Sequence, residues 1–359
     1  KEVKTFQQMH RDGLINRREF LTAMGALGLS ATTAGSLLVS TSAMAATPTR
    51  GGSVIMASNL HGPDDTLDPI VCTSTIDYTR QNTIHNGLIQ IWDDMSLHPE
   101  LAEEWSVNSN ATEYSFKIRQ GVEFHSGGTL SADDVVWSMN RHLGEDSPSS
   151  IKAFFSNVVE WKKVDSHTVK LSLSSPDADM PIKLTQFQAK IAKEGTTDFS
   201  KGAGTGPYVV DSFQPGIKSV HSRNPNYWRS TGQHLDQIEI TAITDPNARL
   251  NALLSGDIDM ATVLSAKSIK QVEATDGVEV MSVPAGLYGG ICCLKNTLPG
   301  SDDDFVMGMR WIQDREKIVR SFLKGHGQVI REDRLAFISI PDPPLFHIAL
   351  NSRDPQPLR

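Results

Sequence analysis

The sequence predicts a mixed α/β or α+β fold, because strand patterns and capped helix patterns occur together along most of the chain. Residues 113–119 and 167–173 alternate apolar and polar side chains with a period of two, as half-buried strands do. Helix-start signals occur at Ser131 and at Asp245. No internal repeat is found, and the apolar content of 39% is ordinary for a globular protein.

Several segments of the chain are expected to form strands, and four of them show it by their apolar pattern. Residues 51–59 are a short apolar segment that begins with a glycine pair. Residues 113–119 place a tyrosine, a phenylalanine and an isoleucine on one face, and residues 167–173 and 237–243 repeat the alternation with aliphatic residues. The apolar members of these strands are the candidate core.

Two helices are expected from their termini. Ser131 precedes Asp134 in the Ser-x-x-Asp spacing of a capping box, and an apolar face follows. Asp245 is followed by Pro246, a capping side chain before a proline at the first helical position. A leucine stripe continues this second helix until Gly256, where we expect it to end.

The N-terminal region has the order of a secretory signal peptide. Arg17 and Arg18 stand before a mildly apolar, uncharged stretch at 23–39, and a small-x-small cleavage signal ends at Ala45. The stretch is shorter than the ~20 apolar residues of a membrane helix, which is the alternative. Cleavage after Ala45 leaves enough chain for two lobes of roughly 150 residues each.

The acidic charge argues against nucleic acid as a partner. The formal net charge is −8, and segment 1–45 holds five Lys or Arg against three acidic residues, so the remaining chain carries −10. Cys72, Cys292 and Cys293 are too few for a disulfide framework and lack the spaced ligands of a zinc site. The adjacent pair is expected to fill a buried strand.

No catalytic residue, metal site or cofactor is predicted. A secreted hydrolase is an alternative, but the chain has neither a Gly-x-Ser-x-Gly nor a His-Glu-x-x-His motif. The histidines lack ligand spacing, although His61, His85 and His98 could converge in the fold and hold a metal chelate. An adhesion or chaperone module with an exposed apolar cleft is a third alternative.

Two further patterns concern packing. Trp92, Trp105 and Trp137 are expected to pack in a core or between lobes. The glycine-rich segment 202–207 lacks the Gly-Lys-Ser of a phosphate-binding loop, and its proline removes a backbone donor. It is therefore expected to form a tight turn into a strand that begins at Tyr208.

Five ordered segments carry a family resemblance. TLDPIVCTSTIDYTRQNTIHNGLIQ, LHPELAEEWSV, YSFKIRQGVEFHSGGTLSADDVVWSMNR, GTGPYVVDSFQPGIKSVHSRNPNYWR and NALLSGDIDM resemble the peptide/nickel class (family 5) of extracytoplasmic solute-binding proteins of ABC importers. The resemblance extends from about Gly51 to Val329. It implies a periplasmic-binding-protein-like bilobal clamshell, two α/β lobes that close on a solute and deliver it to an inner-membrane ABC permease.

The same resemblance implies the function and the partners. We expect a periplasmic monomer that binds a peptide or a similar small polar solute without a cofactor, with a nickel or metal chelate as the alternative ligand of the class. The segment at 16–22 resembles a twin-arginine signal, with Asn16 and Thr22 replacing its first and last members. The twin-arginine translocase would then recognise Arg17 and Arg18 and export a folded cargo.

The resemblance also implies an order of domains. Listed in full, the expected ranges are 1–45 for the signal peptide, 46–92 for the first part of lobe I, 93–203 for a subdomain attached to lobe I, 204–290 for the second part of lobe I, 291–329 for the start of lobe II, and 330–359 for a divergent, irregular tail.

The candidate ligand contacts come from the loop that follows the Leu-Asp-Pro turn. In the resembling family this loop runs along the floor of the cleft, which by position places Thr73, Ser74 and Thr75 at the ligand. Their hydroxyls donate and accept hydrogen bonds without charge, which suits a peptide backbone. The alternative is a solvated surface turn. Tyr288, at the start of a strand expected to cross between the lobes, is a second candidate for the cleft wall.

The resemblance stops beyond Val329. Residues 330–359 contain five prolines and no sustained period, so an irregular segment is predicted. Family members continue further, build most of lobe II and return a C-terminal segment to lobe I. We therefore expect a truncated or frame-shifted reading frame, with natural divergence as the alternative, and consequently weak solute binding and a tendency to aggregate.

Overall fold

The computed structural model describes residues 50–92, 94–230, 232–284, 294, 296–321, 323–324 and 345–351. The chain divides into two compact units, residues 1–51 and 52–359, and every element named below belongs to the second. The expected signal peptide, with Arg17 and Arg18, and the expected strand around Tyr288, Cys292 and Cys293 lie outside the described residues.

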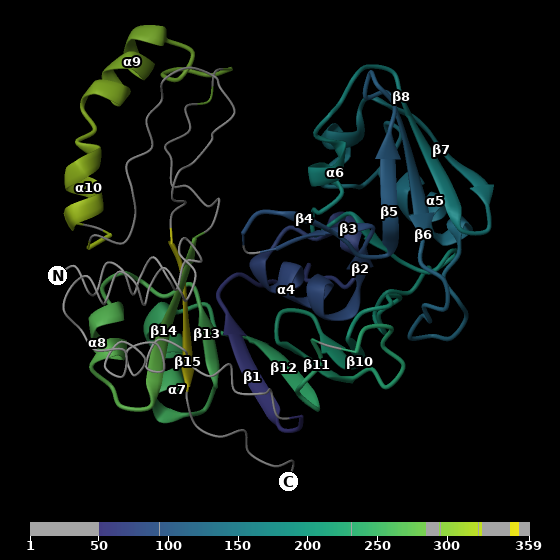
Figure 1. Cartoon of the computed structure of the whole chain (residues 1–359). Coiled ribbons are helices and arrows are strands. Elements are labelled where there is room, and N and C mark those ends of the chain that lie inside the picture. The colour runs from purple at the N-terminus through teal and green to yellow at the C-terminus, as the bar shows by residue number, and fades with distance from the viewer. Residues whose placement is uncertain are drawn as a thin grey trace, which may run out of the picture. The chain divides into compact units, whose positions relative to one another are not determined.

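The largest sheet has seven strands in the order β10-β11-β12-β1-β13-β15-β14 (Figure 1). Its strands are β1 (Ser53–Ser58), β10 (Tyr208–Gln214), β11 (Lys218–Arg223), β12 (Gln237–Ala242), β13 (Met260–Thr262), β14 (Val278–Pro284) and β15 (Leu345–Asn351). β1 runs parallel to β12 and to β13, and the other neighbours are antiparallel. The predicted strands at 51–59 and 237–243 are confirmed as the parallel pair at the centre of this sheet.

The prediction of an irregular tail is wrong for residues 345–351. β15 lies between β13 and β14 and pairs with both, so a C-terminal segment does return to this sheet. Of the five prolines that suggested irregular structure, three stand at positions 341–344, immediately before the strand begins, and two stand at 355 and 357, after it ends. A proline is compatible with a strand that starts after it, because only the interior of a strand needs the missing N–H group.

A second sheet of four strands has its own core. Its order is β5-β6-β8-β7, with β5 (Ala102–Val107), β6 (Glu113–Ile118), β7 (Val158–Asp165) and β8 (Thr168–Leu173). The predicted alternation is confirmed, since Tyr114, Phe116 and Ile118 are buried together with apolar residues of β8. Helix α5 (Ala132–Asn140) packs against β7 and β8. The seven-stranded sheet has a separate core, in which Ala57 and Ala261 meet Leu253 of helix α7 (Pro246–Ser255).

The remaining elements are short. They are η1 (Pro69–Val71), α4 (Thr75–Ile84), β2 (Asn86–Gly87), β3 (Ile89–Ile91), β4 (Leu97–Pro99), η2 (Lys152–Phe155), α6 (Met180–Lys183), β9 (Lys190–Ile191), α7 (Pro246–Ser255), α8 (Ile269–Glu273), α9 (Asp303–Trp311) and α10 (Arg315–Ser321). β2 pairs with β9 and β3 pairs with β4, in each case antiparallel. No helix among the described residues is long and apolar enough to cross a membrane.

Both predicted helix starts are confirmed. The backbone N–H and the hydroxyl of Ser131 donate to the Asp134 carboxylate at 2.8 and 2.9 Å, which closes the capping box of α5. The Asp245 carboxylate accepts from the backbone N–H of Ala248 at 2.7 Å and caps α7. Gly256 ends α7 with a φ of 81°, the left-handed conformation that glycine adopts without strain.

The glycine-rich segment forms the predicted turn into β10 and also packs against the end of α4. A Cβ atom at Gly204 would lie 2.0 Å from the Ile84 carbonyl oxygen, and one at Gly206 would lie 2.5 Å from the Ile84 carbonyl carbon. The backbone N–H of Gly206 donates to that same Ile84 oxygen at 3.1 Å. Glycine is therefore required here by close backbone approach.

The tryptophans differ from one another in burial. Trp105 packs, half-buried, against the core of the four-stranded sheet, as predicted. Trp92 is 51% exposed and stacks on the His98 ring with centroids 3.6 Å apart, so core packing is wrong for this residue. Trp137 is half-buried on α5 beneath the Arg141 guanidinium.

Candidate functional site

The candidate site is the segment that joins β1 to α4. Asp68 accepts from the Ile70 backbone N–H at 3.3 Å and caps η1. Ser74 accepts from the Asp77 backbone N–H at 3.3 Å and caps α4. The predicted hydroxyl residues Thr73, Ser74 and Thr75 therefore lie between two capped helical turns, where the backbone has little freedom.

A buried arginine of α4 anchors the first half of this segment. The Arg80 side chain is fully buried, and its Nη1 donates to Asp65 Oδ2 at 3.0 Å and to Asp77 Oδ1 at 3.1 Å. Its Nε donates to Ser219 Oγ of β11 at 3.1 Å, and its guanidinium lies 5.0 Å from the centre of the Phe213 ring. Burial raises the pKa of the Asp77 carboxyl above its usual value.

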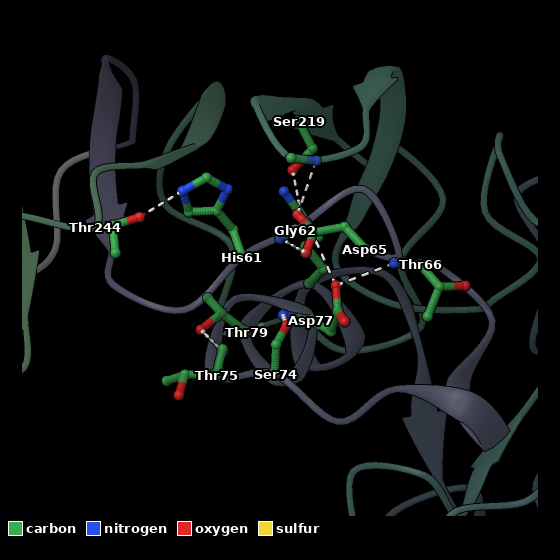
Figure 2. Close-up of polar contacts among 12 residues, drawn as sticks. His61, Gly62, Asp65, Thr66, Ser74, Thr75, Asp77, Thr79, Ser219 and Thr244 are labelled. Atoms are coloured by element: carbon green, nitrogen blue, oxygen red, sulfur yellow. Dashed lines mark hydrogen bonds and ion pairs between the residues drawn. The ribbon is translucent and has the colours of Figure 1, made fainter.

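Backbone donors complete the coordination of the two carboxylates. Asp65 accepts from the Gly62 and Gly216 N–H groups at 2.9 and 3.1 Å, and Asp77 accepts from the Thr66 N–H at 3.2 Å (Figure 2). One guanidinium and several N–H groups thus satisfy two buried acids, as buried charges require. The segment before α4 is joined in this way to β11 and to the β10–β11 turn.

Residues from 141 to 188 hold the second half of the segment. Arg141 Nη2 pairs with Asp68 Oδ2 at 2.5 Å. The Ser150 backbone N–H donates to the Ile70 carbonyl at 2.9 Å, and the buried Gln188 side chain donates to the Cys72 carbonyl at 3.0 Å. No local pattern in the sequence indicated these contacts, which join residues 73 to 116 positions apart.

The predicted ligand residues are placed together at the start of α4. Thr73 is exposed, whereas Ser74 and Thr75 are half-buried. Among the residues that the structure describes, the hydroxyls of Thr73 and Thr75 have no hydrogen-bond partner, and the Ser74 hydroxyl accepts its cap bond. Figure 2 shows the Thr75 side chain directed away from the Asp65–Asp77 cluster, while the Thr75 carbonyl accepts from Thr79 Oγ1 at 3.1 Å.

A hollow of about 400 Å³ lies nearby, on α5, and the predicted hydroxyls do not line it. It is lined by Asp133, Val136, Trp137, Asn140, Arg141 and Glu194. Arg141 connects the two features, because its guanidinium lies 5.0 Å from the Trp137 ring centre and 4.8 Å from that of Phe199 while it pairs with Asp68. The hollow is therefore lined by Arg141, the same residue that pairs with Asp68 in the segment before α4.

The three histidines considered as metal ligands do not converge. His61 Nε2 bonds to Thr244 Oγ1 at 2.7 Å, as Figure 2 shows, and His98 Nε2 bonds to Ser96 Oγ at 2.7 Å. His85 is buried, and burial lowers its pKa well below the usual value. Within the described parts of the chain, no group of three His, Cys, Asp or Glu side chains could hold a metal ion.

Comparison with known proteins places the chain in a family. The family model described as "Bacterial extracellular solute-binding proteins, family 5 Middle" matches residues 96–332, more than half of the chain. The probable D,D-dipeptide-binding periplasmic protein DdpA of Escherichia coli is 25% identical over 284 residues, which are 74% of this chain and 54% of that protein. Di/tripeptide-binding protein 1 of Pseudomonas aeruginosa is 30% identical over 236 residues, 56% of this chain and 44% of that protein.

Solved structures agree with this assignment. The chain resembles the binding protein AgaA of A. tumefaciens R10, solved with agropinic acid, with a TM-score of 0.71, 25% identity, and coverage of 80% of this chain and 60% of that one. It also resembles the fold of DppA of Helicobacter pylori, solved with the peptide STSA, with a TM-score of 0.69, 19% identity, and coverage of 79% and 60%.

These comparisons test the family membership that the sequence motifs predicted. The chain spans about half the length of the relatives it matches, 54% and 44% in the two cases above. The predicted periplasmic-binding-protein-like fold is confirmed, and so is the predicted setting outside the cytoplasm, since the family is an extracellular one. The chain belongs to family 5 of the bacterial extracellular solute-binding proteins.

Proposed function

We propose that the protein is the periplasmic solute-binding component of an ABC importer and that it captures peptides or a similar small polar solute. The observation that carries this proposal is the family match over residues 96–332. The relatives named for di- and tripeptides, D,D-dipeptides and glutathione favour a ligand with peptide bonds. A metal chelate is less well supported, because the described histidines do not assemble.

Thr73, Ser74 and Thr75 are the proposed solute contacts, with Tyr288 as a further contact from the other wall. Two properties of the loop support them. Gln188 binds its Cys72 carbonyl, Arg80 and Arg141 bind the carboxylates of Asp65 and Asp68 that precede it, and its threonine hydroxyls are left without partners among the described residues. Uncharged donors on a preorganised backbone suit the amide groups of a peptide, since little entropy is lost on binding.

The same proposal includes partners and domain boundaries. The loaded protein would deliver its solute to an inner-membrane ABC permease, act as a monomer without turnover of the solute, and reach the periplasm through the twin-arginine translocase by way of Arg17 and Arg18. Lobe I would comprise 46–92 and 204–290 with the attached subdomain 93–203, and 291–329 would begin lobe II.

Calorimetry on the whole chain tests the function. We expect heat of binding from a panel of di- and tripeptides or from glutathione, and none from nickel–histidine. In the same titrations, Thr73→Val and Thr75→Val are each expected to weaken binding by about 3- to 10-fold, because each removes one hydrogen bond to the solute. Absence of binding to every peptide tried would contradict the proposed ligand class.

A matched control separates solute contact from general damage. Thr275→Val removes a threonine hydroxyl at a half-buried position, one that donates to the Gln271 carbonyl at 2.8 Å beyond the end of α8. We expect its affinity to equal that of the unmodified chain. An equal loss in Thr275→Val and Thr73→Val would contradict the assignment of residues 73–75.

A further inference from the structure

The loop that carries Thr73 is held at successive positions by residues far along the chain. Asp68 pairs with Arg141, and the Ile70 carbonyl accepts from the Ser150 backbone N–H at 2.9 Å. The Cys72 carbonyl, directly before Thr73, accepts from Gln188 Nε2 at 3.0 Å. The Ser150 hydroxyl lies 3.3 Å from both the Cys72 and the Ile70 carbonyl oxygens, so its single hydrogen is shared between them. All three donors come from the segment proposed as a subdomain.

Gln188 is built into the structure as a buried support. It is 5% exposed and lies between α6 and β9, the strand that pairs with β2. Its neighbour Phe187 stacks on the Tyr78 ring of α4, with centroids 4.7 Å apart and planes 11° apart. The Gln188 amide therefore joins the Cys72 carbonyl to the segment that leads into β9, and the Phe187 ring joins that segment to α4.

We propose that Gln188 and Ser150 are positioning residues for solute binding: they fix the Cys72 carbonyl and thereby the direction of the hydroxyls that follow it. Neither residue touches the solute. The consequence is that the subdomain sets the affinity of the binding loop. This inference rests on the proposed function, because it assigns a purpose to the loop at residues 73–75.

The physical reason is geometric. Donors that hold the Cys72 carbonyl fix the peptide plane between Cys72 and Thr73, and that plane, together with the φ of Thr73, sets where the Thr73 Cβ points. With both donors removed, the plane rotates until water satisfies the carbonyl, and the threonine side chain moves with it. A buried side-chain amide is a costly residue to retain unless its hydrogen bond is made, and Gln188 makes its bond here.

The first test uses Cys72 as a reporter of loop opening. Its side chain is 0% exposed, and burial, together with the negative charges of Asp77 and Asp68, raises the pKa of its thiol. Alkylation of Cys72 therefore requires the loop to open. With Cys292→Ser and Cys293→Ser as the background, we expect Gln188→Leu to speed alkylation by about 3- to 10-fold, through loss of one hydrogen bond.

Ser138→Ala is the matched control. The buried Ser138 hydroxyl donates to the Ala192 carbonyl and accepts from the Ala192 N–H, each at 3.0 Å, so both of these hydrogen bonds stay within the same segment and neither reaches residues 68–75. Its alkylation rate is expected to remain that of the background. Ser150→Ala, at an exposed position, gives a second and milder variant in case Gln188→Leu does not fold. Equal rates in background, Gln188→Leu and Ser150→Ala would overturn the proposal.

The second test asks whether the effect of Gln188 on peptide binding depends on the Thr73 hydroxyl. Binding of the best peptide is measured for Gln188→Leu, for Thr73→Val and for the double variant. Gln188→Leu is expected to weaken binding by about 3- to 10-fold alone and by clearly less in the Thr73→Val background, because the support then has no hydroxyl to place. Full additivity, or the same loss in Ser138→Ala, would overturn the positioning role.

Failure of the proposed function is distinguishable from failure of this inference. If the unmodified chain binds no peptide, the proposed ligand class is wrong. The alkylation rates alone then test whether Gln188 and Ser150 hold the loop. Faster alkylation confined to Gln188→Leu and Ser150→Ala would then still support a holding role for the two residues. If the chain binds peptide and both variants bind it unchanged, the function stands and the inference falls.

Discussion

At the scale of single residues, Arg80 shows how charge and burial together define the loop before α4. Its guanidinium meets two carboxylates, Asp65 and Asp77, and all three side chains are nearly inaccessible. A surface ion pair contributes little to stability, but removing one member of a buried group leaves the others charged and unpaired. Arg80 therefore matters for the fold of the candidate site although no motif in the sequence singled it out.

Replacing Arg80 is expected to be severe. Arg80→Met should lower the free energy of unfolding by about 3–5 kcal/mol, because two buried acids lose their counterion. Urea titration measures this loss. Lys117→Met is the control: Lys117 lies 3.4 Å from Glu104 at an exposed site, and such pairs are worth about 1 kcal/mol or less. Similar midpoints for the two variants would show that the buried cluster contributes no more than a surface pair.

Buried histidines predict how stability depends on pH. Burial lowers the pKa of His142 to about 4 and that of His221 to about 3, below the roughly 6.5 of an unfolded histidine. Each is neutral in both states above pH 6.5, and below it the unfolded chain takes up protons that the folded chain refuses. Stability is therefore full above about pH 6.5 and is lost as the pH falls toward 4.

The measurement is the unfolding free energy between pH 7 and pH 4.5. We expect the unfolding free energy to decline by about 1.4 kcal/mol per pH unit for each histidine, because the unfolded chain binds one more proton there than the folded chain. His142→Asn can retain the contact with Ser149, which lies 2.6 Å from His142 Nδ1, and should reduce the slope. An unchanged slope would mean that His142 is not the group that takes up the proton.

At the scale of elements, the junction between α4 and the turn before β10 depends on glycine. Gly204→Ala would place a Cβ 2.0 Å from the Ile84 carbonyl oxygen, so backbone must move. We expect a loss of about 1–3 kcal/mol or more, measured by thermal unfolding. Gly308→Ala in α9 is the control, since open space surrounds that site and alanine favours helix by about 1 kcal/mol. Equal effects at both glycines would contradict the close packing.

The elements that were predicted correctly have signals contained within a few residues. The capping box at Ser131, the cap at Asp245 and the glycine end at Gly256 each depend on neighbours in the chain, and each is confirmed. The strand β15 was missed because prolines before it dominated the local pattern, whereas pairing with β13 and β14 decides its structure. Such pairing is a tertiary effect that overrides local propensity.

At the scale of the whole molecule, the described part of the chain exposes apolar side chains around α9. Trp311 is 82% exposed, Leu298 81% and Ile312 72%. Exposed apolar groups that lie close along the chain favour association in water. The sequence analysis expected aggregation from a sheet edge left unpaired, and β15 pairs with β13 and β14 instead. The apolar side chains around α9 give a different reason for association, which stays a prediction.

Sedimentation at several concentrations tests that location. The unmodified chain should be the proposed monomer when dilute and should show mass that rises at high concentration. Trp311→Ser should reduce this rise, because it removes the largest exposed apolar side chain of α9. Val107→Ser, an exposed apolar site on β5, is the control and should leave association unchanged. A strictly monomeric unmodified chain at all concentrations would contradict this prediction.

The sequence alone determined the family, the mixed fold, the helix termini and the central strands, because each follows from neighbouring residues or from ordered motifs. It also placed Thr73, Ser74 and Thr75 in one loop, and their contact with solute stays a prediction. Only the tertiary structure decided what holds that loop. Arg80 meets Ser219, and Gln188 meets Cys72, across separations of more than 100 residues, which no local periodicity records. Burial of those contacts comes from the packing of whole sheets and helices.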